Sequence, residues 1–288
     1  MKINSALVLQ GGGMKSMFTT GVLDAFLEED LFFPYIVGVS AGAANGIVFL
    51  AREEGRFCRI SLTYLHDPRF MSVKNYRKVG SYFNFDFIYN EVPHQHDIFD
   101  YDALFEAEEE LEIGATNCET GKVDYFSFQE AKHNDDFQTF LQSLYASCSV
   151  PCVCKPITIN KISYLDGGIG APIPTERARE QGYDHQVVIL THPLKPEQAS
   201  RIRNLPPRWV YRNTYPAVAT LCTRHAEISN RTIDTLLAGQ EEGRITIIAP
   251  DDTFGVYSAS RNRSKLLRLY FHGFEKGLSI AKHIQTKE

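Results

Sequence analysis

The chain has 288 residues, of which 43% are hydrophobic and 23% are charged, and its formal net charge is −5. These proportions are typical of a folded globular protein and exclude a disordered chain. A negative net charge without a clustered run of basic residues argues against a nucleic-acid partner.

The first 51 residues predict a strand, a glycine turn and a helix, twice in succession. Ala6 to Leu9 is an apolar run typical of a strand buried on both faces, and Gly11 to Gly13 opens a helix that begins at Met14. Tyr35 to Val37 predicts the second strand, and Ala41 to Ala51 the second helix. Because the first run is far too short for a signal peptide or a membrane span, we expect a cytoplasmic chain.

The alternation continues up to residue 195. The pattern predicts a hairpin, a helix, a second pair of short strands, another helix and a buried strand. These segments are Leu111 to Thr116 with Val123 to Phe126, Phe137 to Ala146, Ile157 to Ile159 with Ile162 to Leu165, Glu176 to Gln181, and Gln186 to Leu190. Such alternation predicts an α/β protein with helices on both faces of its sheet.

Beyond residue 195 the pattern changes to charged helical stretches. Ala226 to Gly239 and Arg263 to Ala281 predict helices, and the apolar run Ile245 to Ala249 between them predicts one more strand of the sheet. We therefore expect a main domain over residues 1–195 and an extension docked on it over residues 196–288.

Ser40 is the first candidate for chemistry. Gly38-Val39-Ser40-Ala41-Gly42 is G-x-S-x-G between a predicted strand and a predicted helix, the context of a nucleophile elbow. Gly38 and Gly42 allow the tight turn that would hold the serine hydroxyl above the end of the sheet. On this motif alone an ordinary turn with a capping serine stays open.

The loop Gly11-Gly12-Gly13, which leads into Met14, is a candidate anion site. It follows a strand and opens a helix, so its amides are unpaired donors at the positive end of the helix dipole. In acyl transfer the anion is the tetrahedral oxygen, and these donors would form an oxyanion hole. Nucleotide binding is disfavoured because Ser16 takes the third glycine position of G-x-G-x-x-G.

Asp166-Gly167-Gly168 ends a predicted strand and presents a carboxylate at the end of the sheet. Together with an elbow serine, Asp166 is the obvious group to take the serine proton. A histidine base stays open, because five histidines follow Asp166 in the chain. They are His185, His192, His225, His272 and His283, and we interpret each as structural or as a surface residue, since none lies in a distinctive loop motif.

The six cysteines are expected to be free thiols. Cys148, Cys152 and Cys154 cluster in sequence, but a spaced fourth ligand is missing, so we expect no metal site.

Aromatic and basic residues alternate between the second helix and the hairpin. The aromatic residues are Tyr64, Phe70, Tyr76, Tyr82, Phe83, Phe85, Phe87 and Tyr89, and the basic ones are Arg69, Lys74, Arg77 and Lys78. One interpretation is core packing of an insertion. The other is a wall for an acyl chain, combined with transient contact to anionic lipid headgroups.

These motifs resemble the patatin-like phospholipases: GGGMKS at 11–16, GVSAG at 38–42 and DGG at 166–168. The resemblance implies a three-layer sandwich with a central, mostly parallel sheet, helices on both faces and a helical C-terminal extension. It also implies hydrolysis of carboxylic esters of phospholipids or related lipids, through an acyl-enzyme on a Ser40–Asp166 dyad without histidine. The resemblance implies no cofactor and no metal.

Lys15 matches the basic residue of the family's loop, whereas Ser16 stands where the family usually has glycine. The added hydroxymethyl group bears on helix packing near this loop more than on its amide donors. Two alternatives use the same fold: a non-catalytic lipid-binding protein, and an acyltransferase with an acceptor other than water. The expected partner is a lipid ester, reached by peripheral contact with the inner face of the membrane.

Overall fold

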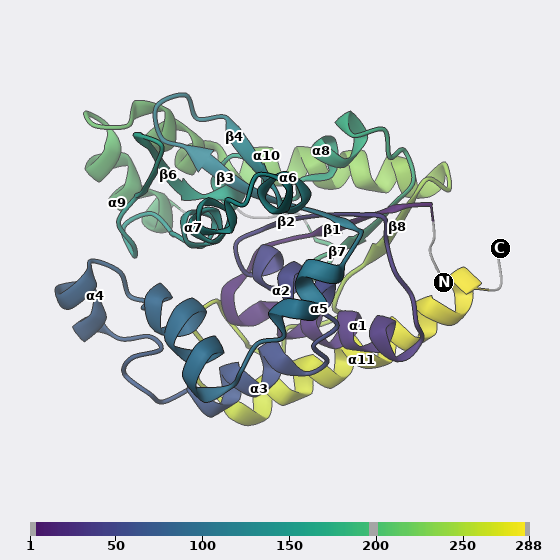
Figure 1. The fold of residues 1–288 in the computed structure, drawn as a ribbon. Helices are drawn as coiled ribbons and strands as arrows, with labels where there is room; N and C mark the ends of the chain where they lie inside the picture. The colour runs from purple at the N-terminus through teal and green to yellow at the C-terminus, as the bar shows by residue number, and fades with distance from the viewer. Residues whose placement is uncertain (1–3, 196–200, 286–288) are drawn as a thin grey trace.

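The structure is a computed structural model that describes residues 4–195 and 201–285. A central sheet lies between two layers of helices, which confirms the expected α/β sandwich (Figure 1). None of the helices in these ranges combines the length and the apolar character needed to cross a bilayer.

The described strands form one 8-stranded sheet in the order β5-β6-β3-β2-β1-β7-β8, with β4 paired to β3. Their bounds are β1 (Ala6–Leu9), β2 (Tyr35–Val39), β3 (Glu110–Asn117), β4 (Val123–Ser127), β5 (Ile157–Ile159), β6 (Ile162–Asp166), β7 (Gln186–Ile189) and β8 (Ile245–Ile248). The ladders among β3, β2, β1, β7 and β8 are parallel, and those of β4, β5 and β6 are antiparallel. All the predicted strands are confirmed.

The helices include several that the sequence patterns did not predict. The α-helices are α1 (Met17–Glu28), α2 (Ala41–Leu50), α3 (Arg56–Thr63), α4 (Val73–Val79), α5 (Tyr101–Glu106), α6 (Phe128–His133), α7 (Phe137–Ser147), α8 (Thr175–Glu180), α9 (Arg201–Tyr211), α10 (Pro216–Glu241) and α11 (Arg263–Gln285). Two short 3-10 helices, η1 (Gly13–Ser16) and η3 (Gly167–Ile169), and a π-helix, η2 (Phe87–His96), complete the set.

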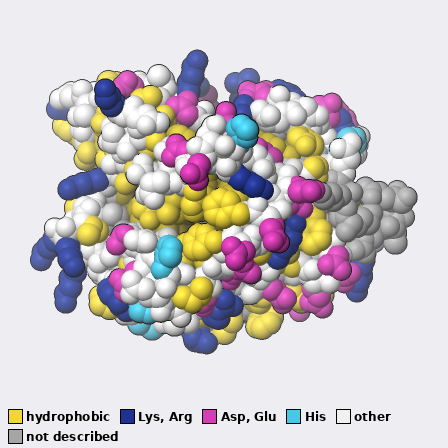
Figure 2. Space-filling view, in the orientation of Figure 1, with side chains coloured by type: hydrophobic (Ala, Val, Ile, Leu, Met, Phe, Trp, Pro, Cys, Tyr) yellow, Lys and Arg dark blue, Asp and Glu magenta, His cyan; other side chains and the backbone are white. Residues whose placement is uncertain are grey.

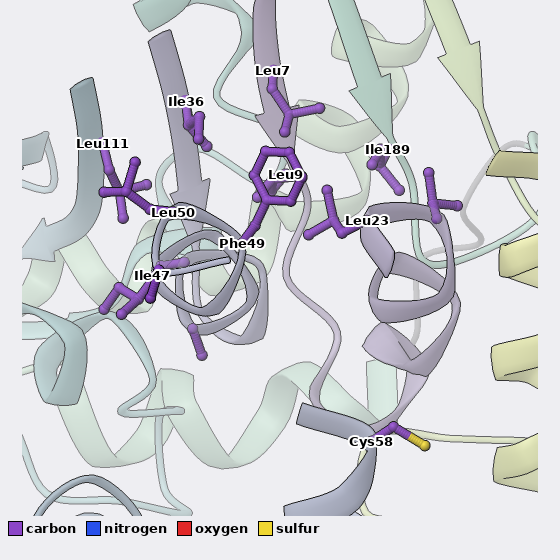
Figure 3. Close-up of a cluster of buried hydrophobic side chains, with 14 of the residues drawn as sticks. Leu7, Leu9, Leu23, Ile36, Ile47, Phe49, Leu50, Cys58, Leu111 and Ile189 are labelled. Atoms are coloured by element: carbon purple, nitrogen blue, oxygen red, sulfur yellow. The ribbon is translucent and has the colours of Figure 1, made fainter. Parts of the chain in front are cut away.

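The two faces of the sheet are buried by alternate residues of the same strands. Leu7 and Leu9 of β1 belong to the cluster formed with α1, α2 and α11, whereas Ala6 and Val8 belong to the cluster formed with α8 and α10. Figure 3 shows the first cluster, where side chains of the strands meet those of the helices that cover them. A strand with both faces buried accounts for the continuous apolar runs in the sequence.

The arrangement around β3 explains how distant residues meet. β2 pairs with residues 110–114 of β3 and β6 with residues 115–117, while β4 pairs with residues 112–116. Because β4 overlaps both partners, it occupies one edge of β3, and β2 and β6 share the other edge. The two strands run toward each other along that edge, so Ser40, after β2, and Asp166, at the end of β6, come together.

Residues after 200 continue the sheet and its helical layers. β8 pairs in parallel with β7, as expected, and α10 begins at Pro216, ten residues before the expected start at Ala226. α11 packs against α1 through glycines: a Cβ on Gly21 or Gly273 would lie 2.0 or 2.1 Å from a backbone oxygen of the other helix. These two helices can therefore approach only without side chains at these positions.

Candidate active site

Ser40 occupies a sharp turn between β2 and α2. Its φ of 54° and ψ of −133° are unusual for a residue with a side chain. Gly42 permits the turn, because a Cβ there would lie 2.5 Å from the carbonyl oxygen of Leu9. The local geometry is that of the expected elbow, with a strained serine between a strand and a helix.

Ser147 connects this turn to β3. Its hydroxyl accepts a hydrogen bond from the Ser40 amide at 2.8 Å and donates to the carbonyl of Gly114 at 2.6 Å. Ser147 is fully buried at the end of α7. Residues 146–151 resemble the family in sequence, but sequence reasoning assigned Ser147 no role.

The side chains of Ser40 and Asp166 are in direct contact. The Ser40 hydroxyl donates to Oδ2 of Asp166 at 2.8 Å, and the Gly168 amide donates to Oδ1 at 2.8 Å. Gly167 lets the aspartate loop lie against β3, because a Cβ on it would stand 2.1 Å from the carbonyl oxygen of Gly114. The carboxylate is thereby held between a hydroxyl donor and an amide donor.

Burial raises the pKa of Asp166 to about 6, and the hydrogen bonds from Ser40 and Gly168, with the charge of His225, oppose this rise. A carboxylate with such a pKa is ionised at neutral pH and is a stronger base than an ordinary aspartate. The arrangement can therefore withdraw a proton from the serine hydroxyl.

The glycine loop lies beside Ser40. A Cβ on Gly11 would be 2.8 Å from the Ser40 Cβ, and the Gly11 carbonyl accepts from the Thr191 hydroxyl at 2.7 Å. The amide of Met14 is engaged elsewhere, because it donates to the carbonyl of Ser258 at 3.0 Å. Of the expected oxyanion donors, Met14 is thus already paired, Gly11 lies next to the serine, and Gly12 and Gly13 line the same cavity as Ser40. Lys15, which follows Met14, lines the cavity beside Ser40 that is described next.

Ser40 and Asp166 open into an apolar cavity of about 680 Å³. Its walls include Ile47 of α2, Ile60 of α3, Leu141 of α7 and the expected aromatic stretch. Figure 2 shows hydrophobic side chains gathered in a hollow on one face of the molecule. A cavity of this size and lining can hold much of an aliphatic ligand.

The aromatic stretch supplies both the core and the cavity. Phe70, Phe83, Phe85 and Tyr89 line the cavity, whereas Phe87 is fully buried in the core and does not line it. Core packing therefore describes some residues of this segment and a cavity wall describes others, because neighbouring residues face different surroundings.

Two of the five histidines line the cavity. His192, just after β7, has Nε2 3.0 Å from Nε2 of Gln10, and His225, on α10, has Nε2 3.1 Å from the carbonyl oxygen of Gly168. Since the carbonyl can only accept, Nε2 of His225 carries the proton. The position of His192 after a strand of the sheet was a usable signal, because ligands bind at that end of parallel strands.

Ser16 is fully buried, and among the described residues its hydroxyl has no hydrogen-bond partner. Its carbonyl accepts from the Thr20 hydroxyl, and α1 begins at the next residue, Met17.

The clustered cysteines are free thiols, and two of them contact hydroxyls. Sγ of Cys148 lies 3.6 Å from the Tyr89 hydroxyl, and Cys154 accepts from the Ser81 hydroxyl at 2.9 Å. Within residues 4–195 and 201–285, no three His, Cys, Asp or Glu side chains are close enough to share a metal ion.

Comparison with known proteins gives two family matches. The family described as patatin-like phospholipase matches residues 7–179, and a domain of unknown function (DUF6363) matches residues 215–286. The chain is 26% identical over 243 residues to the uncharacterized protein YjjU of Escherichia coli (strain K12). That alignment covers 81% of this chain and 64% of YjjU, so the chain spans less than two thirds of this relative.

Among solved structures, VipD from Legionella pneumophila is similar with a TM-score of 0.47 and 14% identity. The superposition covers 97% of this chain and 67% of VipD.

Proposed function

The chain belongs to the patatin-like phospholipase family, and we propose that it hydrolyses carboxylic esters of lipids through an acyl-enzyme on Ser40. The observation that carries the proposal is the 2.8 Å hydrogen bond from the Ser40 hydroxyl to Asp166 at an apolar cavity. A nucleophile, a base and a site for an acyl chain are thus adjacent.

In the first half of the reaction, Asp166 takes the proton of Ser40 as its oxygen attacks the ester carbonyl. The carbonyl oxygen becomes an oxyanion, which the amides of Gly11 to Gly13 stabilise; one such donor is worth about 3 kcal/mol in a serine hydrolase. The tetrahedral intermediate collapses, and Asp166 returns the proton to the departing alcohol. The products are an acyl-Ser40 ester and the alcohol part of the lipid.

In the second half, Asp166 removes a proton from water as its oxygen attacks the acyl-enzyme. The second tetrahedral intermediate breaks its bond to the Ser40 oxygen, Asp166 returns the proton to that oxygen, and a fatty acid is released from the restored enzyme. The two cavity histidines support Asp166 as the direct base, because Nε2 of each contacts a group other than Ser40. Nε2 of His192 lies against Gln10, and Nε2 of His225 lies against the carbonyl of Gly168. We further propose that the protein is cytoplasmic and that lipids of the inner membrane face are its substrates.

Labelling with a fluorophosphonate probe tests the assignment. We expect mass mapping to find the phosphonyl group on Ser40, and both labelling and p-nitrophenyl ester hydrolysis to disappear in Ser40→Ala. Ser143→Ala, which also removes a buried serine hydroxyl, serves as the control and should be labelled normally. Labelling of another serine, or unchanged turnover by Ser40→Ala, would refute the proposal.

The same assay separates the alternatives. A non-catalytic lipid-binding protein would leave Ser40 unlabelled and the ester intact. An acyltransferase would label at Ser40 but give a new ester when an alcohol acceptor is added, instead of free fatty acid.

A further inference from the structure

The mouth of the cavity is marked by lining residues that are also exposed. Val150, in the loop after α7, is 37% exposed, and Pro206 of α9 is likewise exposed while lining the cavity. The loop at residues 149–155 contacts segments on both sides: the Lys155 amide donates to the Gly80 carbonyl, and the Cys152 amide donates to the Tyr211 hydroxyl. The loop at residues 149–155, which carries Val150 at the mouth, thus joins residues 72–81 to residues 206–212, and these three segments together are here called the rim.

The rim exposes large hydrophobic side chains in an unusual density. Val73 is 66% exposed and Trp209 is 63% exposed, and their exposed hydrophobic neighbours in the rim are Tyr76, Val79, Val150 and Val210. Clustered exposed hydrophobic residues mark interaction surfaces, whereas single ones carry no meaning.

The rim is also basic and contains no acidic residue. Its six basic residues are Lys74, Arg77, Lys78, Lys155, Arg208 and Arg212, all exposed. This is opposite in sign to the whole chain, whose net charge is −5. Figure 2 shows basic side chains projecting at the edge of the molecule formed by α4.

From this combination we propose that the rim docks on a lipid bilayer rich in anionic headgroups, with the mouth of the cavity facing the lipid. The basic residues attract the headgroups, and Trp209, Val210 and the apolar residues of α4 enter the interface. The inference rests on the proposed function, because a hydrolase of membrane lipids must draw its substrate from a bilayer into the cavity. A protein partner could also bind an apolar surface. The rim, however, carries six basic residues and no acidic residue, which favours a uniformly anionic partner such as a bilayer.

Sedimentation with vesicles tests docking without any need for catalysis. We expect the full chain, and equally Ser40→Ala, to sediment with vesicles that contain phosphatidylglycerol, far less with phosphatidylcholine alone, and less as salt is added. Each basic residue near such a surface is worth about fivefold in affinity, so Lys74→Glu, Arg77→Glu and Lys78→Glu together should weaken binding by about 100-fold or more. Trp209→Ser should weaken it at any salt concentration.

The matched control reverses three exposed charges outside the rim, Arg179→Glu, Arg231→Glu and Arg244→Glu, and should keep most of the binding. Hydrolysis of a soluble short-chain ester should be unchanged in the rim and control variants, which keep Ser40, and this also verifies their folding. Equal losses in the rim and control variants, or no sedimentation of the unaltered chain at low salt, would overturn the docking proposal. Absence of ester hydrolysis with intact vesicle binding would instead count against the proposed function.

Discussion

His225 Nε2 lies 3.1 Å from the carbonyl oxygen of Gly168, two residues after the carboxylate that contacts Ser40. His225 belongs to α10, in the part of the chain matched by the domain of unknown function. The Ser258 carbonyl, from the same part, accepts from the Met14 amide beside the glycine loop. The C-terminal part thus contacts both the aspartate loop and the glycine loop of the candidate site.

We expect His225 to position the aspartate loop, so that His225→Ala lowers kcat by about fivefold, the value of one hydrogen bond, with KM little changed. His225→Gln should restore kcat, because the glutamine amide can donate to the same carbonyl. If His225→Ala abolished turnover as completely as Asp166→Asn, His225 would be a base, and the triad interpretation of the sequence would prevail.

The pH dependence of kcat/KM should report Asp166. The base acts when it is deprotonated, so activity should rise through a pKa of about 6, level off above about pH 7, and fall about tenfold per pH unit below pH 6. Because the charge of His225 lowers the pKa of Asp166, His225→Gln should move this midpoint upward. A pH profile with no inflection between pH 5 and about 7 would contradict the assignment of the base.

Asp166→Asn should abolish activity and stabilise the fold at neutral pH. Because folding raises this pKa from 3.8 to about 6, the carboxyl favours the folded state below about pH 4, and that stability is lost as the pH rises through 6. Asp166→Asn avoids this loss of stability, which amounts to about 3 kcal/mol. This value is an upper bound on the gain in stability, because the asparagine side chain is also buried. Chemical denaturation at pH 4 and pH 8 measures it: the difference in free energy of unfolding should appear only at the higher pH.

Sequence reasoning predicted the strands well, since β1, β2 and β7 are buried on both faces and their apolar runs have one interpretation. It missed short helices such as α4 and α5, although Ser72 and Asp100 accept amide hydrogen bonds at their first turns, as capping residues do. Their six or seven residues are too few to show a helical period. α9 was missed because Pro206 and Pro207 lie inside it, where proline usually ends a helix.

The candidate site was predictable only in its local parts. Ser40 and Asp166 lie in motifs that predict a turn at a strand end. Their contact, however, depends on β2 and β6 meeting along one edge of β3. Ser147 and His225 contact the site through hydrogen bonds between segments that are distant in sequence. A sequence period cannot reveal such contacts, because tertiary packing creates them.

Ser16→Ala should stabilise the protein by about 1 kcal/mol, because it removes a buried hydroxyl that has no partner in the described residues. Ser143 provides the matched control: it is equally buried, but its hydroxyl donates to the Phe140 carbonyl at 2.7 Å, so Ser143→Ala should not stabilise. Thermal or urea unfolding of both variants measures the two changes. A loss of stability in Ser16→Ala would mean that this hydroxyl is paired in solution.

Phe83 and Phe87 lie four residues apart, but only Phe83 lines the cavity. If the cavity holds the acyl chain, Phe83→Ala should enlarge it and raise the rate for long-chain p-nitrophenyl esters relative to short ones. Phe87→Leu alters the fully buried core of the same segment, so it should lower stability but keep the chain-length profile. Probe labelling of Ser40 in both variants verifies that the chemical groups are intact. Identical chain-length profiles in a stably folded Phe83→Ala would show that the acyl chain binds elsewhere, because a wall residue cannot lose most of its volume without changing what fits beside it.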